Sequence, residues 1–162
     1  MHPFDLNLHE SLGVNPSWSG TSPSDFHADA EIAGVEIVAC AHTCLAHGFK
    51  STDDEGVERA LFNGGSAGMG NFKGDTAGVI TRISTKDGGK GEDGGEVLYG
   101  CEVGGVRVEA VRVEFDDGDW QREFLDMWPE GSEAFESYWG RIQGGVESWD
   151  VGRAARGGVE LR

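Results

Sequence analysis

His42 and Cys44, two residues apart, are the residues of this chain whose types and spacing best fit chemistry. They follow an apolar run, Val35 to Cys40, that is typical of a short buried strand. Ligand side chains often stand in loops at the carboxyl ends of strands, because the strand fixes them while the loop leaves them accessible. An imidazole and a thiolate at this spacing can both point at one metal ion. The sequence therefore predicts a metal site after this strand.

The charge balance limits the partners that the chain can bind. Its 162 residues include 13 basic and 29 acidic side chains, which give a formal net charge of −16. Such a surface repels phosphate backbones and anionic lipid, so we expect neither nucleic acid nor a membrane as a partner. Positive charge for an anionic substrate would have to come from metal cations or from a few local basic residues.

Cysteine usage and the lack of a long apolar run predict a cytoplasmic protein. The three cysteines, Cys40, Cys44 and Cys101, are an odd number and too few for a disulfide scaffold, which favours a reducing compartment. No apolar run approaches the ~20 residues that a membrane-spanning helix needs. The first residues also lack the basic and apolar regions of a signal peptide.

Apolar periodicity and turn residues together predict a mixed α+β chain. A helix is expected from Ser22 to about Ala33, where Gly34 ends it. Five strands are expected, over 35–40, 57–63, 76–85, 96–102 and 106–115. The segments between them are expected to be a polar loop at 41–56, a glycine-rich loop at 64–70 and a flexible hairpin connection at 87–95. The alternation of apolar residues slips at Ala110-Val111, which predicts a β-bulge.

Two helices are expected to close the domain. Asp116 to Asp119 cap a helix over 120–128, and Ser132 caps a helix over 133–143. The aromatic stripes of both helices are expected to lie in the core. We therefore expect a domain over 1–143 and a flexible tail over 144–162, because the tail is rich in Gly and Arg.

These motifs, in this order, resemble the C-terminal part of calcineurin-like metallophosphoesterases. Such enzymes end a buried strand with Gly-His-x-His, which appears here as Ala41-His42-Thr43-Cys44. Many then carry a strand and an Asn-x-Gly-Ser-x-Gly loop, and the similar stretch here is 63–68. A bacterial subgroup also shares a Gly-Val-Ile-Thr-Arg-Ile strand, a Trp-Pro-Glu-Gly-Ser junction and a Tyr-x-x-Arg-Ile stretch, which match 78–83, 128–132 and 138–142.

The resemblance implies a fold, an activity and a set of ligands. The fold is an α+β layered β-sandwich with flanking helices, like the C-terminal half of the family's αββα sandwich. The activity is hydrolysis of a phosphate ester with divalent metal ions: manganese, iron or zinc. By this resemblance His42 is a catalytic metal ligand, Cys44 occupies the position that serves the second metal, and His2 is the remnant of a further ligand block. The substrate-binding residues and the identity of the ester stay open.

The chain departs from the family where the first metal-binding blocks should be. Gly74-Asp75 and Gly70-Asn71 come after His42 rather than before it, and Asn71 is followed by Phe72 rather than by a histidine. We therefore expect a truncated or incomplete chain with little phosphoesterase activity alone. Two alternatives stay open: a non-catalytic binding module that diverged from this fold, and a mononuclear zinc protein that uses His42, Cys44 and one further residue.

The remaining candidates are expected to be structural. His9, His27 and His47 fit ordinary hydrogen-bonded histidines, and Cys40 fits strand packing. The glycine-rich loop fits a turn that needs positive φ better than an anion cradle. The strand over 35–40 is apolar on both faces, so without a neighbour on each side we expect self-association through its open edge.

Overall fold

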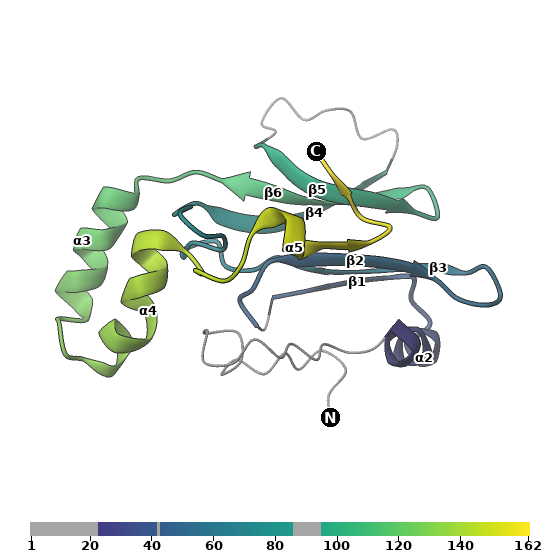
Figure 1. Cartoon of the computed structure of the whole chain (residues 1–162), viewed down its shortest axis with the longest axis horizontal. Helices are drawn as coiled ribbons and strands as arrows, with labels where there is room; N and C mark the ends of the chain where they lie inside the picture. The colour runs from purple at the N-terminus through teal and green to yellow at the C-terminus, as the bar shows by residue number, and fades with distance from the viewer. Residues whose placement is uncertain (1–22, 42, 86–94) are drawn as a thin grey trace.

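The computed structural model describes residues 23–41, 43–85 and 95–162. These residues form an α+β structure in which two four-stranded sheets pack face to face (Figure 1). The helices in these ranges are α2 (Pro23–Ala33), α3 (Asp117–Met127), α4 (Glu133–Gly144) and α5 (Val151–Ala154). None of them has both the length and the apolar character needed to cross a membrane. The expected mixed α+β sandwich is therefore present.

Sheet A carries the strand that precedes the predicted metal loop. Its strands lie in the order β1 (Ile37–Cys40), β3 (Glu58–Asn63), β2 (His47–Thr52) and β7 (Ala155–Gly157). β1 is parallel to β3, β2 is antiparallel to β3, and β7 is parallel to β2. As a result, the carboxyl ends of β1 and β3 and the amino ends of β2 and β7 meet at one end of sheet A. We call this the site end.

Sheet B is antiparallel throughout. Its strands lie in the order β4 (Gly78–Thr85), β6 (Val106–Val113), β5 (Val97–Val103) and β8 (Glu160–Leu161). Gly104 and Gly105, both at positive φ, form the tight turn between β5 and β6. β6 lies between β4 and β5, so these two strands do not form a hairpin, and the expectation of a hairpin connection over 87–95 is wrong. Residues 86–94 of that connection lie outside the described ranges.

The expected β-bulge occurs, but on the partner strand. β6 pairs with β4 without interruption, whereas the register with β5 shifts between Val97 and Tyr99, opposite Val111 and Ala110. The extra residue therefore belongs to β5. Ala110 and Val111 are both buried, but they face opposite sides of β6, because the regular pairing with β4 keeps the alternation of this strand intact.

The main core lies between the two sheets, and a smaller one lies under α2. The smaller core joins Phe26 and Ala30 to Leu61 on the outer face of sheet A. The largest buried apolar side chains of the main core come from both sheets and from the C-terminal segment: Leu45, Phe62, Phe72, Tyr99, Val103, Val108 and Trp149. Burial of this apolar surface is the dominant force that holds the layers together.

Two segments differ from the expectation. The polar loop expected over 41–56 contains β2, whose Gly48 lies so close to its neighbours that a Cβ there would be 3.0 Å from Phe62 and Tyr99. The flexible tail expected over 144–162 instead contains α5, β7 and β8. β7 pairs with β2 and β8 pairs with β5, so this segment connects the two sheets.

α3 and α4 stand to one side of the sheets as a helical hairpin (Figure 1). Asp116 and Ser132 cap them as expected, each accepting a backbone N–H with its side chain. Phe124 stacks on Trp139 with ring centroids 5.9 Å apart, so the aromatic stripes form a small cluster of their own. Several apolar side chains of the hairpin stay exposed, namely Leu125, Met127, Trp128 and Tyr138.

Candidate functional site

The site end of sheet A brings together the two motif-bearing loops. Cys40 and Asn63, the last residues of β1 and β3, are direct partners in the parallel ladder. The turn that begins at Ala41 and the glycine-rich loop that begins at Gly64 therefore leave the sheet side by side. Gly64 donates its backbone N–H to the Cys40 carbonyl at 2.8 Å, which ties the start of the glycine-rich loop to β1.

Asn63 connects these two loops through its side chain. It is 1% exposed. Its Nδ2 donates to Thr43 Oγ1 at 2.8 Å, and its Oδ1 accepts the backbone N–H of Gly65 at 2.8 Å. The Cys40 thiol is a further hydrogen-bond partner; burial raises the pKa of this thiol, and the bond to Asn63 offsets part of that effect. A buried amide with its groups satisfied in this way fixes the relative positions of the loops.

Cys44 is held in an uncommon backbone conformation. Its φ is +53°, which β-carbon-bearing residues rarely adopt, and in the described residues it is the one non-glycine residue at positive φ. The Cys44 N–H donates to the Ala41 carbonyl at 3.0 Å, and its own carbonyl accepts Arg141 Nη2 at 2.7 Å. Such conformations persist where the surroundings over-determine them, and they are common at functional sites.

Arg141 of α4 links the turn to the glycine-rich loop a second time. Besides Cys44, its Nη2 donates to the Gly70 carbonyl at 3.2 Å. Burial lowers the pKa of this guanidinium from its very high ordinary value, with charge interactions from Cys44 and Tyr138 acting the other way. Sequence reasoning assigned no role to Arg141, because its distance of 97 positions from Cys44 gives no local signal.

The glycine-rich loop uses its first backbone donors internally. Gly64 donates to Cys40, Gly65 donates to Asn63, and Ser66 donates to Asn71 Oδ1 at 2.9 Å. Asn71 Nδ2 in turn donates to the Ser66 carbonyl at 2.7 Å. These three N–H groups are therefore engaged in holding the turn, which agrees with the expected structural role for this loop.

His47, the first residue of β2, lies next to Asn63 in the ladder. It is buried, and its Nδ1 contacts the Leu45 carbonyl at 3.1 Å. A carbonyl only accepts, so Nδ1 carries the proton in this contact. Burial lowers the pKa of His47, and the nearby Arg156 lowers it further. The histidine is a neutral, hydrogen-bonded core residue, as expected, although its place beside Asn63 is not visible from the sequence.

His27 lies in a polar cluster with the appearance of a catalytic triad, but its bonds do not fit that role. His27 Nε2 is 2.6 Å from Ser51 Oγ, and its Nδ1 is 2.8 Å from Arg59 Nη1. Arginine only donates, so Nδ1 accepts and the ring proton sits on Nε2, facing Ser51. A general base for the serine would need that nitrogen unprotonated. Arg59 also donates to Asp53 Oδ2 at 2.6 Å, so the cluster fastens α2 to the β2–β3 hairpin.

The structure describes one of the three predicted metal ligands. Cys44 is placed at the site end, whereas His42 and His2 lie outside the described ranges, as does His9. Among residues 23–41, 43–85 and 95–162, no group of three or more His, Cys, Asp or Glu side chains is arranged to hold a metal ion. Comparison with protein-family models, curated proteins and solved structures found no match to this chain.

Proposed function

We propose that this chain is part of a metal-dependent phosphoesterase whose metal ligands include His42 and Cys44. One observation supports the proposal above all. Asn63 joins the turn after β1 to the glycine-rich loop after β3, so the two segments with phosphoesterase-like motifs share one end of sheet A. Ligands at the carboxyl ends of neighbouring parallel strands are a common way to build such sites.

The described residues would prepare the turn for a metal ion. Thr43 and the Cys44 backbone are held by Asn63 and Arg141, so the thiol of Cys44 starts from a fixed backbone. A thiolate suits zinc better than manganese or magnesium. When bound, divalent metal ions polarise a phosphate ester and lower the pKa of a coordinated water. The remaining ligands, including a bridging carboxylate, would come from outside the described residues, and little hydrolysis is expected without them.

Cobalt titration tests the ligand role of Cys44. Co²⁺ replaces zinc in many sites, and a thiolate ligand gives it an intense sulfur-to-metal charge-transfer absorption. We expect this absorption in the unaltered chain and its loss in Cys44→Ser. Cys101→Ser is the matched control, because Cys101 is buried and faces the main core. An absorption that survives Cys44→Ser, or none in the unaltered chain, would contradict a Cys44 ligand.

A second candidate function, non-catalytic binding, is favoured by the α3–α4 hairpin. It exposes four large apolar side chains, and exposed apolar side chains of this kind often contact other proteins: Leu125, Met127, Trp128 and Tyr138. A binding module would need no metal at the turn. Mutation of His42 or Cys44 would then leave every property of the chain except local loop stability unchanged.

A further inference from the structure

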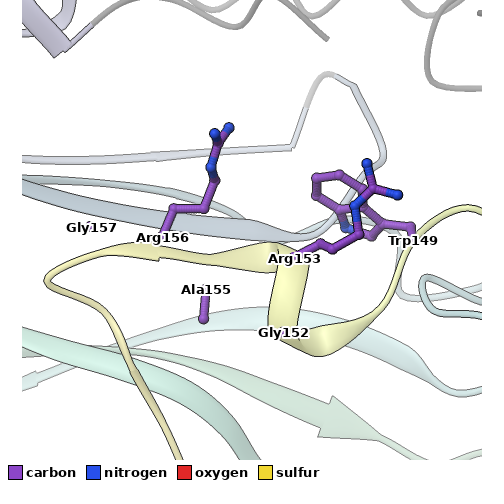
Figure 2. A pocket seen from close by; sticks show the side chains of 6 residues that line it. All are labelled: Trp149, Gly152, Arg153, Ala155, Arg156 and Gly157. Carbon is purple, nitrogen blue, oxygen red and sulfur yellow. The ribbon is translucent and has the colours of Figure 1, made fainter. Parts of the chain in front are cut away.

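A hollow beside α5 and β7 gathers positive charge in an otherwise acidic chain. It measures about 380 Å³ and is lined by six residues: Trp149, Gly152, Arg153, Ala155, Arg156 and Gly157 (Figure 2). Two of the six are arginines and none is acidic, although acidic side chains outnumber basic ones by 29 to 13 in the whole chain. The local charge is therefore opposite to that of the surrounding molecule.

Arg153 is held in place before any ligand arrives. Its guanidinium carbon lies 5.5 Å from the centre of the Trp149 ring, and its Nη1 donates to the Ser148 carbonyl at 2.5 Å. Trp149 is itself fixed, because it is buried and its Nε1 donates to the Ala46 carbonyl at 2.8 Å. The ring contact with Trp149 and the hydrogen bond to Ser148 already restrict the Arg153 guanidinium. It therefore loses less conformational freedom when a ligand binds.

Arg156 is positioned by the pairing of β7 with β2. It lies opposite Phe49 in the ladder, and the next residue, Gly157, has a φ of +63°. A Cβ at Gly157 would come within 2.1 Å of the Lys50 carbonyl oxygen, so a residue with a side chain could not take this backbone conformation next to Arg156 without a shift. Figure 2 shows the side chains of Arg153 and Arg156 on the same side of the ribbon, with Ala155 on the other.

The carboxylate closest in sequence to Arg153 is that of Asp150, and it caps a helix. Asp150 begins α5, and its Oδ1 accepts the backbone N–H of Arg153 at 2.9 Å. This bond caps the helix and is made to the main chain, so it does not neutralise the Arg153 guanidinium by a direct side-chain pair.

We propose that this hollow binds the phosphate group of a small phosphorylated molecule, with Arg153 and Arg156 as its ligands. The planar fork of arginine matches phosphate oxygens, and charge-assisted bonds of this kind are strong. The volume falls within the range of small-molecule sites. Arg153 covers a face of Trp149, so recognition would rest on charge rather than on stacking of a base.

The inference does not depend on the proposed phosphoesterase activity. The hollow lies at the site end of sheet A, because Ala155 pairs with Gly48 at the start of β2. Three strand spacings separate β7 from β1, or about 14 Å. A phosphate bound here would therefore be distinct from one that reacts at the turn after β1.

Calorimetric titration with inorganic phosphate and with glycerol phosphate, in buffer containing a metal chelator, tests the inference. The chelator removes any contribution of a metal site, so failure here says nothing against the phosphoesterase proposal. We expect both probes to bind, and binding to weaken at least about tenfold in Arg156→Gln and in Arg153→Gln. Tighter binding of the ester would identify a phosphorylated metabolite as the ligand, and equal or tighter binding of phosphate would identify the free ion.

The control is Arg122→Gln, which removes the same charge from α3, where Arg122 is 73% exposed. Arg156→Lys keeps the charge but loses the fork, so we expect an intermediate affinity, and the thermal unfolding of each variant shows whether it is folded. No heat of binding up to roughly 10 mM of either probe would overturn the inference. Equal affinity in Arg122→Gln and a folded Arg156→Gln would overturn it as well.

Discussion

Asn63 is the residue on which the geometry of the candidate site depends most. Asn63→Ala removes a buried amide and leaves the Thr43 hydroxyl and the Gly65 N–H without this partner. We expect a loss of about 2–4 kcal/mol in the free energy of unfolding, because each unsatisfied buried group costs about 1–3 kcal/mol. Urea unfolding followed by circular dichroism measures it.

Two threonine variants calibrate that measurement. Thr43→Val removes one partner of Asn63 and should cost less than Asn63→Ala. Thr52→Val alters an exposed position at the end of β2 and should change stability by about 0.5 kcal/mol or less. If Asn63→Ala unfolds at the same urea concentration as Thr52→Val, the bridge between the two loops does not hold them.

Asp53 makes the stability of the β2–β3 hairpin depend on pH. The backbone N–H of Val57, more than any other group, holds the pKa of Asp53 below its ordinary value; burial opposes this, and Arg59 reinforces it. A pKa depressed by folding means that stability is fully present above the unfolded-state pKa, near 4, and is lost as pH falls through the folded-state pKa.

Asp53→Asn should therefore lower the melting temperature at pH 7, and the difference from the unaltered chain should shrink steadily below about pH 4. Asp54→Asn is the control, because it removes the same charge from the next residue. A difference that stays constant down to pH 3, or one matched by Asp54→Asn, would show that the Asp53 contacts do not stabilise the hairpin.

Sequence reasoning reached some of these residues and missed others for a physical reason. His42 and Cys44 stand next to a strand signal, so local pattern points to them. Asn63 and Arg141 lie in stretches that match motifs of the resemblance, but their partners are 20 and 97 positions away, so their roles are not visible before the strands are paired. The role of Asn63 depends on the parallel register of β1 and β3, which periodicity does not specify.

At the scale of elements, the C-terminal segment is part of the core. Trp149→Ala should lower the free energy of unfolding by about 3–5 kcal/mol, because it removes a ring that is buried between elements of both sheets. Trp128→Ala is the matched control: this ring, at the residue that follows α3, is 39% exposed, and its removal should cost about 1 kcal/mol. Equal costs for the two variants would restore the expectation of a loosely attached tail.

The elements that sequence reasoning placed well are those with strong local signals. α2, α3 and α4 have a capping residue or a glycine stop at their ends, and the β5–β6 turn has two glycines. β2 was missed because His47 to Thr52 is mostly polar and includes Gly48. The small size of Gly48 is required by Phe62 on the neighbouring strand and by Tyr99 of the other sheet. β7 and β8 are short and gain their stability from pairing with distant strands, so they leave almost no pattern.

At the scale of the whole molecule, β1 has one partner strand among the described residues. It is an apolar strand parallel to β3, and in those ranges no strand pairs with its other edge. Parallel strands usually lie inside sheets, and an open apolar edge invites pairing with another chain. We therefore expect the protein to self-associate as its concentration rises.

Analytical ultracentrifugation of Ala39→Lys tests the role of this edge. Ala39 is exposed on β1, so the substitution places a charge on the open strand and should shift the protein toward monomer by about tenfold in dissociation constant. Thr85→Lys adds the same charge to the end of β4, an edge of sheet B, and should leave association unchanged. If the unaltered chain stays monomeric at all concentrations tested, the protein does not self-associate through the edge of β1.

The proposed metal site is tested most directly by measuring metal content per chain and hydrolysis of p-nitrophenyl phosphate on the same samples. The samples are the unaltered chain, His42→Ala and, as a control that removes a histidine elsewhere, His9→Ala. We expect bound metal in the unaltered chain and in His9→Ala, its loss in His42→Ala, and any hydrolysis to fall with it. Equal metal content in all three, or hydrolysis that persists in His42→Ala, would contradict a metal-dependent phosphoesterase site at the turn after β1.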